Sequence, residues 1–276
     1  MKRQKISAIL LRISVYLATI ITVGALLFVV GYILIKGVPH LSWKLFEWKY
    51  TTENLSLMPA LLNTILMTAL SLLIAVPLGV FAAIFLVEYA KRGSKLVSII
   101  RMNAETLAGI PSIVYGLFGM LFFVTALKLG FSMLSGALTI SIMILPVILR
   151  TSEEALMSVP DSFREGSFGL GAGRLRTVFR VVLPDAIPGI LAGVILGAGR
   201  TVGETAALLY TAGTSSDTVS GIMDSARTLS VHMYALSQEG MYIDQTYATA
   251  VVLLVIVVGI NALSASIAKR VTKREL

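Results

Sequence analysis

The chain has 276 residues, of which 56% are hydrophobic and only 14% charged, and its mean hydropathy is +0.87. A soluble domain of this length would need far more polar surface to cover its core, so the composition excludes a soluble globular protein and predicts a helical membrane protein. The net charge of +8 requires no nucleic-acid partner, because basic residues on an inner membrane face can meet anionic lipid.

Six stretches are apolar enough, and long enough, to cross a hydrocarbon core of about 30 Å, which takes about 20 helical residues. The fifth stretch is interrupted by Arg200 and Glu204, whereas the others carry no charge. We therefore expect an all-α, polytopic protein with one transmembrane domain over residues 1–276. The expected spans cover about residues 13–35, 59–87, 106–127, 129–149, 186–213 and 245–268.

The first stretch follows the basic sequence MKRQK, as a signal peptide would. Its uncharged core is longer than the usual apolar region of a signal peptide, and no small-x-small cleavage site follows it. We expect this stretch to be retained as the first transmembrane helix.

The distribution of basic residues predicts the orientation of the spans. With the N-terminus inside, most of the 23 Lys and Arg residues fall on the inner side and Arg200 lies within a span. This bias follows the positive-inside rule and predicts that both termini are cytoplasmic. The basic residues left on the outer side are Lys36, Lys44, Lys49, Lys128 and Arg227.

The inner loop, residues 150–185, has features that a solvated loop does not explain. Phe163, Phe168 and Leu170 would be exposed to water in a free loop, at some cost in free energy. A short helix seated in a groove of another protein would bury them, and the neighbouring glycines would let its backbone come close to that partner. We expect such a docking helix over about residues 159–174.

The same loop resembles the cytoplasmic signature of permease subunits from binding-protein-dependent ABC importers, E-A-A-x3-G-x9-I-x-L-P. Here Gly and Ser replace the two alanines and Val replaces Ile, while the spacing is kept without a gap. The resemblance implies a type I ABC importer permease fold and identifies the loop as the segment that couples to a separate ATPase subunit. The matching residues are Glu165, Gly166, Ser167, Gly171, Val181, Leu183 and Pro184.

A narrower resemblance links the chain to phosphate permeases of the Pst type. It rests on AGIPSIVYGLFG, LPVILRTSEEALMSVPDSFREGS and RTVGETAALLYTAG, and the ending GETAALLYTAG with the outer LSVHMYALSQEG is more similar to the A subunit than to the C subunit. The resemblance implies phosphate import across a bacterial inner membrane. The implied partners are a second homologous permease, two ABC ATPase subunits and an external phosphate-binding protein.

The chain is not expected to be an enzyme. It lacks a G-x4-G-K-[ST] phosphate-binding loop, so ATP and Mg would be bound by a partner chain and no cofactor by this one. It contains no cysteine, and its two histidines, His40 and His232, are far apart, so we expect neither a metal site nor a catalytic group.

Arg200 and Glu204 need a specific explanation, because an arginine in the middle of a span costs about 3 kcal/mol on insertion scales. We expect both on one face of a continuous helix, beside a stripe of small residues at Gly189, Gly193 and Gly197 that lets another helix pack closely. One interpretation is an internal ion pair that only locks two helices. The other is a substrate pathway, in which Arg200 offers parallel hydrogen bonds to an oxyanion and Glu204 holds the guanidinium in place.

Two other kinds of transporter remain open at this point. A secondary anion transporter would also place an arginine near the bilayer midplane, although it usually shows inverted repeats with broken helices. An ABC permease for another oxyanion, such as sulfate, molybdate or phosphonate, would share the same general features. A membrane-bound enzyme is less consistent with the sequence, because no cluster of His, Cys or paired acids lies on one side.

Overall fold

The computed structural model describes residues 2–91 and 93–272, and this part of the chain contains helices and no strand. Three helices are extended by π-helical turns: Phe85–Tyr89 continues α2, Met120–Ala126 continues α4, and Val178–Val182 joins α7 to α8. In chain order the helices are α1 (Lys2–Gly37), α2 (Met58–Ile84), α3 (Lys95–Ala108), α4 (Ser112–Gly119), α5 (Met133–Ser158), α6 (Asp161–Gly169), α7 (Arg174–Thr177), α8 (Leu183–Gly203), α9 (Ala206–Leu209), α10 (Leu229–Glu239) and α11 (Ile243–Thr272).

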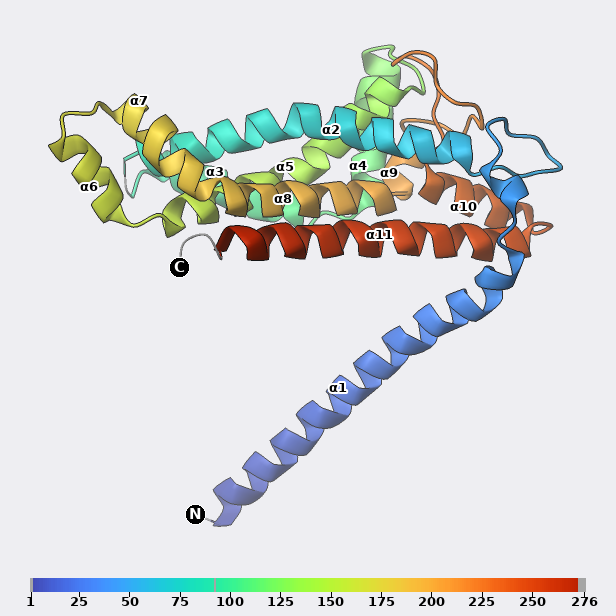
Figure 1. The fold of residues 1–276 in the computed structure, drawn as a ribbon, viewed down its shortest axis with the longest axis horizontal. Coiled ribbons are helices and arrows are strands. Elements are labelled where there is room, and N and C mark those ends of the chain that lie inside the picture. Colours follow the sequence, from blue (N-terminus) through green and yellow to red (C-terminus); the bar gives the residue numbers. More distant parts are fainter. Residues whose placement is uncertain (1, 92, 273–276) are drawn as a thin grey trace.

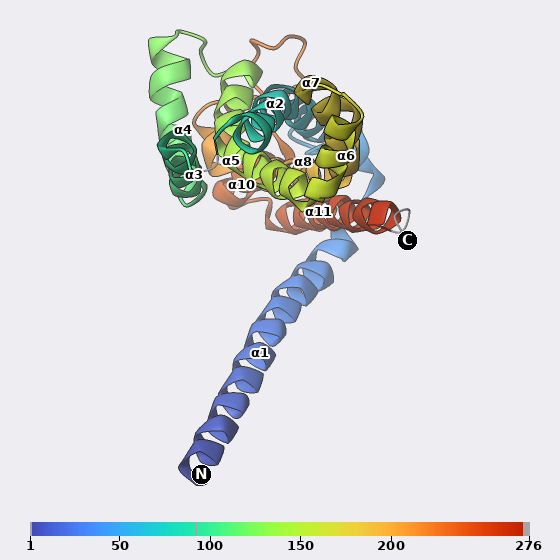
Figure 2. The same ribbon diagram turned by 90° about the vertical axis from the view of Figure 1, so that its left-hand side faces the viewer.

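The body of the protein is a bundle in which α2, α5, α8 and α11 run side by side (Figures 1 and 2). The central element is α5, since 67% of its most apolar window is buried, against 33% for α2 and 17% for α11. Met143, Ile144 and Ile148 of α5 are fully buried in a cluster with Met67 of α2 and Leu208 of α9. Burial of this apolar surface, at about 25 cal/mol per Å², fixes the positions of the helices that carry the candidate site.

The small-residue stripe on α8 packs against α5. A Cβ at Gly189 would lie 2.6 Å from Cβ of Ala155, and a Cβ at Gly193 would overlap the side chain of Thr151. Only glycine therefore permits this separation of the two helices, as the sequence pattern predicts.

Helix α1 leaves the bundle, and its contacts with the start of α11 lie near its C-terminal end (Figure 1). There Tyr32 meets Tyr247 with ring centroids 5.8 Å apart, and Gly37 lies directly against the Tyr247 carbonyl. None of the most apolar window of α1 is buried within this chain. Its surface is thus available to lipid or to another subunit.

Two of the expected spans require correction. The third, expected as one helix over residues 106–127, is bent by 100° between α3 and the helix formed by α4 and its π-helical extension. Pro111 ends the helical path there, because it lacks an N–H and disfavours helical geometry in the residue before it. The fifth, expected as one helix over residues 186–213, ends at Gly203.

Five helices of the described chain are long and apolar enough to cross a membrane, and the bent pair brings the total to six if it forms one span. The expectation of six transmembrane segments is confirmed in this form. The expected fourth span, residues 129–149, lies in α5, which continues to Ser158 and so extends into the expected inner loop.

The outer segments are connected to the bundle by buried polar contacts. Asn63 of α2 is fully buried; its amide nitrogen donates to the carbonyls of Asp217 and Arg227, and its amide oxygen accepts from the Val219 N–H. Nearby, His232 of α10 is 1% exposed, and its Nδ1 faces the Arg227 guanidinium at 3.3 Å. These contacts hold residues 217–229 over the outer end of α2.

Candidate functional site

The candidate coupling segment lies at the end of the bundle where α11 also ends (Figure 1). Helix α6 begins directly after Pro160, whose fixed φ suits the residue before a helix. It ends in a turn in which Gly171 has a φ of +82°, a left-handed conformation that favours glycine. The expected docking helix over about residues 159–174 is therefore shorter, Asp161–Gly169, and a tight turn separates it from α7.

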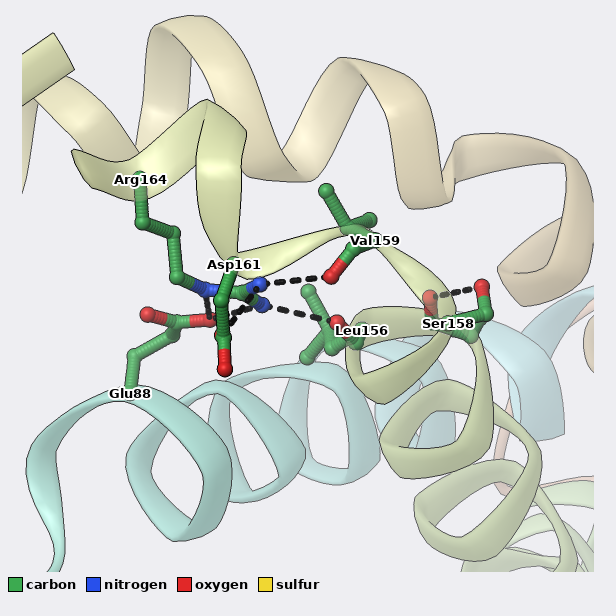
Figure 3. Close-up of polar contacts among 7 residues, drawn as sticks. Glu88, Leu156, Ser158, Val159, Asp161 and Arg164 are labelled. Carbon is green, nitrogen blue, oxygen red and sulfur yellow. Dashed lines mark hydrogen bonds and ion pairs between the residues drawn. The ribbon is translucent and has the colours of Figure 1, made fainter. Parts of the chain in front are cut away.

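Arg164 is the main polar connection between α6 and the transmembrane helices (Figure 3). Its Nη2 lies 2.7 Å from Oε1 of Glu88, at the end of α2, and its Nε donates to the same oxygen at 3.1 Å. Nη1 and Nη2 also donate to the backbone carbonyls of Val159 and Leu156, where α5 ends. The side chains of Arg164 and Glu88 are only 13% and 8% exposed, so solvent screens this ion pair weakly.

Two further contacts join α6 and α7 to each other and to α2. The guanidinium of Arg174 lies over the ring of Tyr89, 5.6 Å from its centroid, a cation–π geometry. The hydroxyl groups of Ser167 and Thr177 are 2.8 Å apart.

The outward surface of this segment combines apolar and charged groups. Leu170 is 91% exposed and Phe163 about half exposed, as the sequence suggested, whereas Phe168, also about half exposed, lines the cavity between α6 and the bundle. Glu165 is exposed on the same short helix. Exposed apolar side chains beside charges are typical of a protein-docking surface.

The signature residues divide into two groups in space. Glu165, Gly166 and Gly171 are exposed on or just after α6, whereas Ser167 is partly buried by its contact with Thr177. Val181, Leu183 and Pro184 lie at the junction of α7 with α8, where Val181 and Leu183 are partly buried. The first group can contact a partner directly, and the second connects the segment to α8.

Arg200 and Glu204 do not form the ion pair considered above. The helix stops at Gly203, and Glu204 adopts an extended conformation with a ψ of 128°. Its Oε1 accepts a hydrogen bond of 3.0 Å from the Ala207 N–H and so caps α9, while its carbonyl accepts from the Ser230 hydroxyl at 2.5 Å. The expectation that both residues lie one turn apart on a continuous helix is therefore wrong, and the carboxylate binds the Ala207 N–H instead.

Among the described residues, no hydrogen bond or ion pair involves Arg200. The side chain is partly buried near the end of α8, within Coulombic range of the Tyr115 hydroxyl of α4. That hydroxyl donates to the Leu107 carbonyl at 2.7 Å, across the bend between α3 and α4. Arg200 thus has guanidinium donors available for a ligand.

Sequence reasoning missed Glu88, Arg164 and Tyr115 as members of these two regions. Glu88 carried a weak signal, because it is a carboxylate placed directly after a long apolar span. Its partner is 76 residues away in sequence, and no local pattern predicts that pairing. No group of three or more His, Cys, Asp or Glu residues that could hold a metal ion occurs among the residues described.

Residues 75–275 match the family model described as "Binding-protein-dependent transport system inner membrane component". The chain is 37% identical over 229 residues to the probable ABC transporter permease protein YqgI of Bacillus subtilis, covering 78% of each chain. It is 34% identical over 219 residues to the phosphate transport system permease protein PstA 1 of Mycobacterium tuberculosis, covering 78% of this chain and 71% of the relative.

The fold is also similar to that in the crystal structure of a bacterial alginate ABC transporter in complex with an alginate pentasaccharide-bound periplasmic protein. The TM-score is 0.65 over 94% of this chain and 95% of that one, at 16% sequence identity. At this identity the similarity shows the fold alone.

Proposed function

Since the chain belongs to the family of binding-protein-dependent transport system inner membrane components, we propose that it is the permease subunit of an ATP-driven importer of inorganic phosphate. It would form half of the translocation pathway in a bacterial inner membrane. The anion is suggested by relatives named as phosphate transport permeases, with identities of 33–38%. Arg200 is the observation in this chain that best supports an anionic substrate.

The partly buried guanidinium of Arg200 suits phosphate for two reasons. It keeps its charge at any physiological pH, and its planar donors can bind two oxygens of an oxyanion in parallel. Glu204 supports this arrangement indirectly: by capping α9 it fixes the break that follows α8. A carboxylate close to the pathway also opposes excessively tight anion binding, which transport requires.

Energy would reach the pathway through the exposed surface of α6 and its following turn. Phe163 and Leu170 would dock on a separate ATPase subunit, which binds ATP and Mg. The complete importer would contain this permease, a second homologous permease, two ATPase subunits and an extracytoplasmic phosphate-binding protein. Closure of the ATPase pair would move α6 and shift the pathway between outward- and inward-facing states.

The test is co-purification of the importer, followed by uptake and ATPase assays in proteoliposomes with phosphate and, as a control, sulfate. We expect phosphate to stimulate both activities and sulfate to stimulate neither. Stimulation by sulfate, molybdate or phosphonate instead of phosphate would refute the assignment of the anion. Uptake driven by an ion gradient without ATP would point to a secondary transporter.

Arg200 variants test the site within the same assay. Arg200→Gln removes the cation and should lower phosphate uptake by about tenfold or more, the value of one charge-assisted hydrogen bond of roughly 1.5 kcal/mol. Arg200→Lys should retain part of the uptake, because a point charge lacks the bidentate geometry. The double variant Arg200→Gln/Glu204→Gln should remain as inactive as Arg200→Gln. Near-normal uptake by that double variant would exclude a substrate contact by Arg200.

A further inference from the structure

The coupling segment has an unusual mechanical arrangement, because α6 is not packed into the bundle by apolar contacts. None of its residues is buried. Behind it lies a cavity of about 990 Å³, lined by Glu88, Tyr89, Arg164, Phe168 and Arg174 among others. The cavity separates α6 from the bundle, so movement of α6 reaches the transmembrane helices through the contacts that cross it.

Arg164 provides a contact of this kind to two transmembrane helices at once. Its guanidinium binds Glu88 at the end of α2 with two donors, and it binds the carbonyls of Leu156 and Val159 at the end of α5 (Figure 3). A planar guanidinium fixes the directions of all these bonds together, which a flexible ammonium group cannot do. The two side chains are only 13% and 8% exposed, so little solvent competes for the carboxylate and the link is strengthened.

We infer that the Arg164–Glu88 pair is the positioning link that carries movement of α6 into α2 and α5 and so couples ATP hydrolysis to opening of the pathway. This inference rests on the proposed function. It extends that function by naming the residues that transmit the movement, neither of which belongs to the exposed surface that would touch the ATPase. The segment has other contacts, between Ser167 and Thr177 and between Arg174 and Tyr89, but among the described residues only Arg164 binds the ends of α2 and α5 from α6 itself through several hydrogen bonds.

A purely structural role would have a different signature. If the pair only holds the docking surface in shape, its loss would weaken ATPase binding, and ATP hydrolysis and uptake would fall together. If the pair transmits movement, the ATPase would still bind and hydrolyse ATP, but less phosphate would move for each ATP. The ratio of uptake to hydrolysis separates these cases.

The experiment uses the complete importer in proteoliposomes, with Arg164→Gln, Arg164→Lys and Glu88→Gln compared with wild type. The matched control is Glu154→Gln, which breaks the exposed pair that Arg150 and Glu154 form on α5, at 3.0 Å. Phosphate uptake and ATP hydrolysis are measured in the same preparation, and ATPase retention is measured by co-purification.

We expect Arg164→Gln to retain the ATPase and lower the phosphate moved per ATP by roughly tenfold, within the range of coupling between distant sites. Arg164→Lys and Glu88→Gln should lower the ratio less, because each keeps part of the hydrogen bonding, and Glu154→Gln should leave it unchanged. An unchanged ratio in all three variants, or parallel loss of ATPase binding and uptake in all three, would overturn the inference. Failure of the proposed function is distinct, since wild type itself would then show no phosphate-stimulated uptake.

Discussion

Gly193 offers a sharp test of the packing between α5 and α8, because two opposing effects of one methyl group can be compared. Gly193→Ala places a Cβ in overlap with Oγ1 of Thr151 and 2.7 Å from its Cβ. Rotation of the Thr151 side chain can move Oγ1, which donates to the Val147 carbonyl at 2.9 Å, but it cannot move Cβ. The two helices must therefore separate.

The strain should exceed the gain in helix propensity. Overpacking of this kind costs about 1–3 kcal/mol, whereas replacing glycine by alanine within a helix returns about 0.5–1 kcal/mol. Because the overlap with Thr151 is severe, we take the upper half of the first range, about 2–3 kcal/mol, which leaves a net loss of about 1–2.5 kcal/mol and a decrease in Tm of roughly 2–10 °C for a chain of this size. We expect this decrease for detergent-purified protein. The Tm is measured from the fraction of folded protein that size-exclusion chromatography recovers after heating.

Gly199→Ala is the matched control on the same helix. Its Cβ would meet only Asn261 and Ile260, at 3.6 and 3.9 Å, which are ordinary contacts. The propensity term should therefore dominate, and Tm should rise slightly. A Tm for Gly193→Ala equal to or above that of wild type would refute the packing argument. Partial recovery in Gly193→Ala/Thr151→Ala would support it, since that variant removes one of the two overlapping atoms.

Two further predictions concern the outer side. Burial, and secondarily the Arg227 charge, lower the pKa of His232 from 6.5 to about 4. Between these two values the imidazole is protonated in the unfolded chain but neutral in the folded one. The stability present above pH 6.5 should therefore fall by up to about 3 kcal/mol as the pH drops toward 4. The difference between the Tm at pH 7 and the Tm at pH 4.5 should be smaller in His232→Gln than in wild type. An equal difference in both proteins would contradict this. Asn63→Ala leaves two carbonyls and the Val219 N–H without a hydrogen-bond partner. Each buried polar group left unpaired costs about 1–3 kcal/mol, so hydrogen exchange at residues 217–229 should accelerate roughly tenfold or more. Unchanged protection there would show that other contacts hold the outer segment.

The long apolar segments were predictable because the property that defines them is local. A bilayer span needs a certain length of apolar sequence, and α2, α5 and α11 meet that requirement without help from the rest of the chain. The glycine stripe on α8 is also a local pattern, and it correctly indicated close packing by another helix. The exposed Phe163, Phe168 and Leu170 followed in the same way from single apolar residues within a basic loop.

Only the tertiary structure decided where these helices end and which charges meet. Periodicity favoured a continuous helix through Glu204, but its carboxylate caps α9 and its carbonyl binds Ser230, 26 residues away. Likewise, Arg164 finds Glu88 across 76 residues of chain. Apolar length is summed along the sequence, whereas a buried polar group takes whichever partner the packing brings within about 3 Å, and that partner is set by contacts distant in sequence.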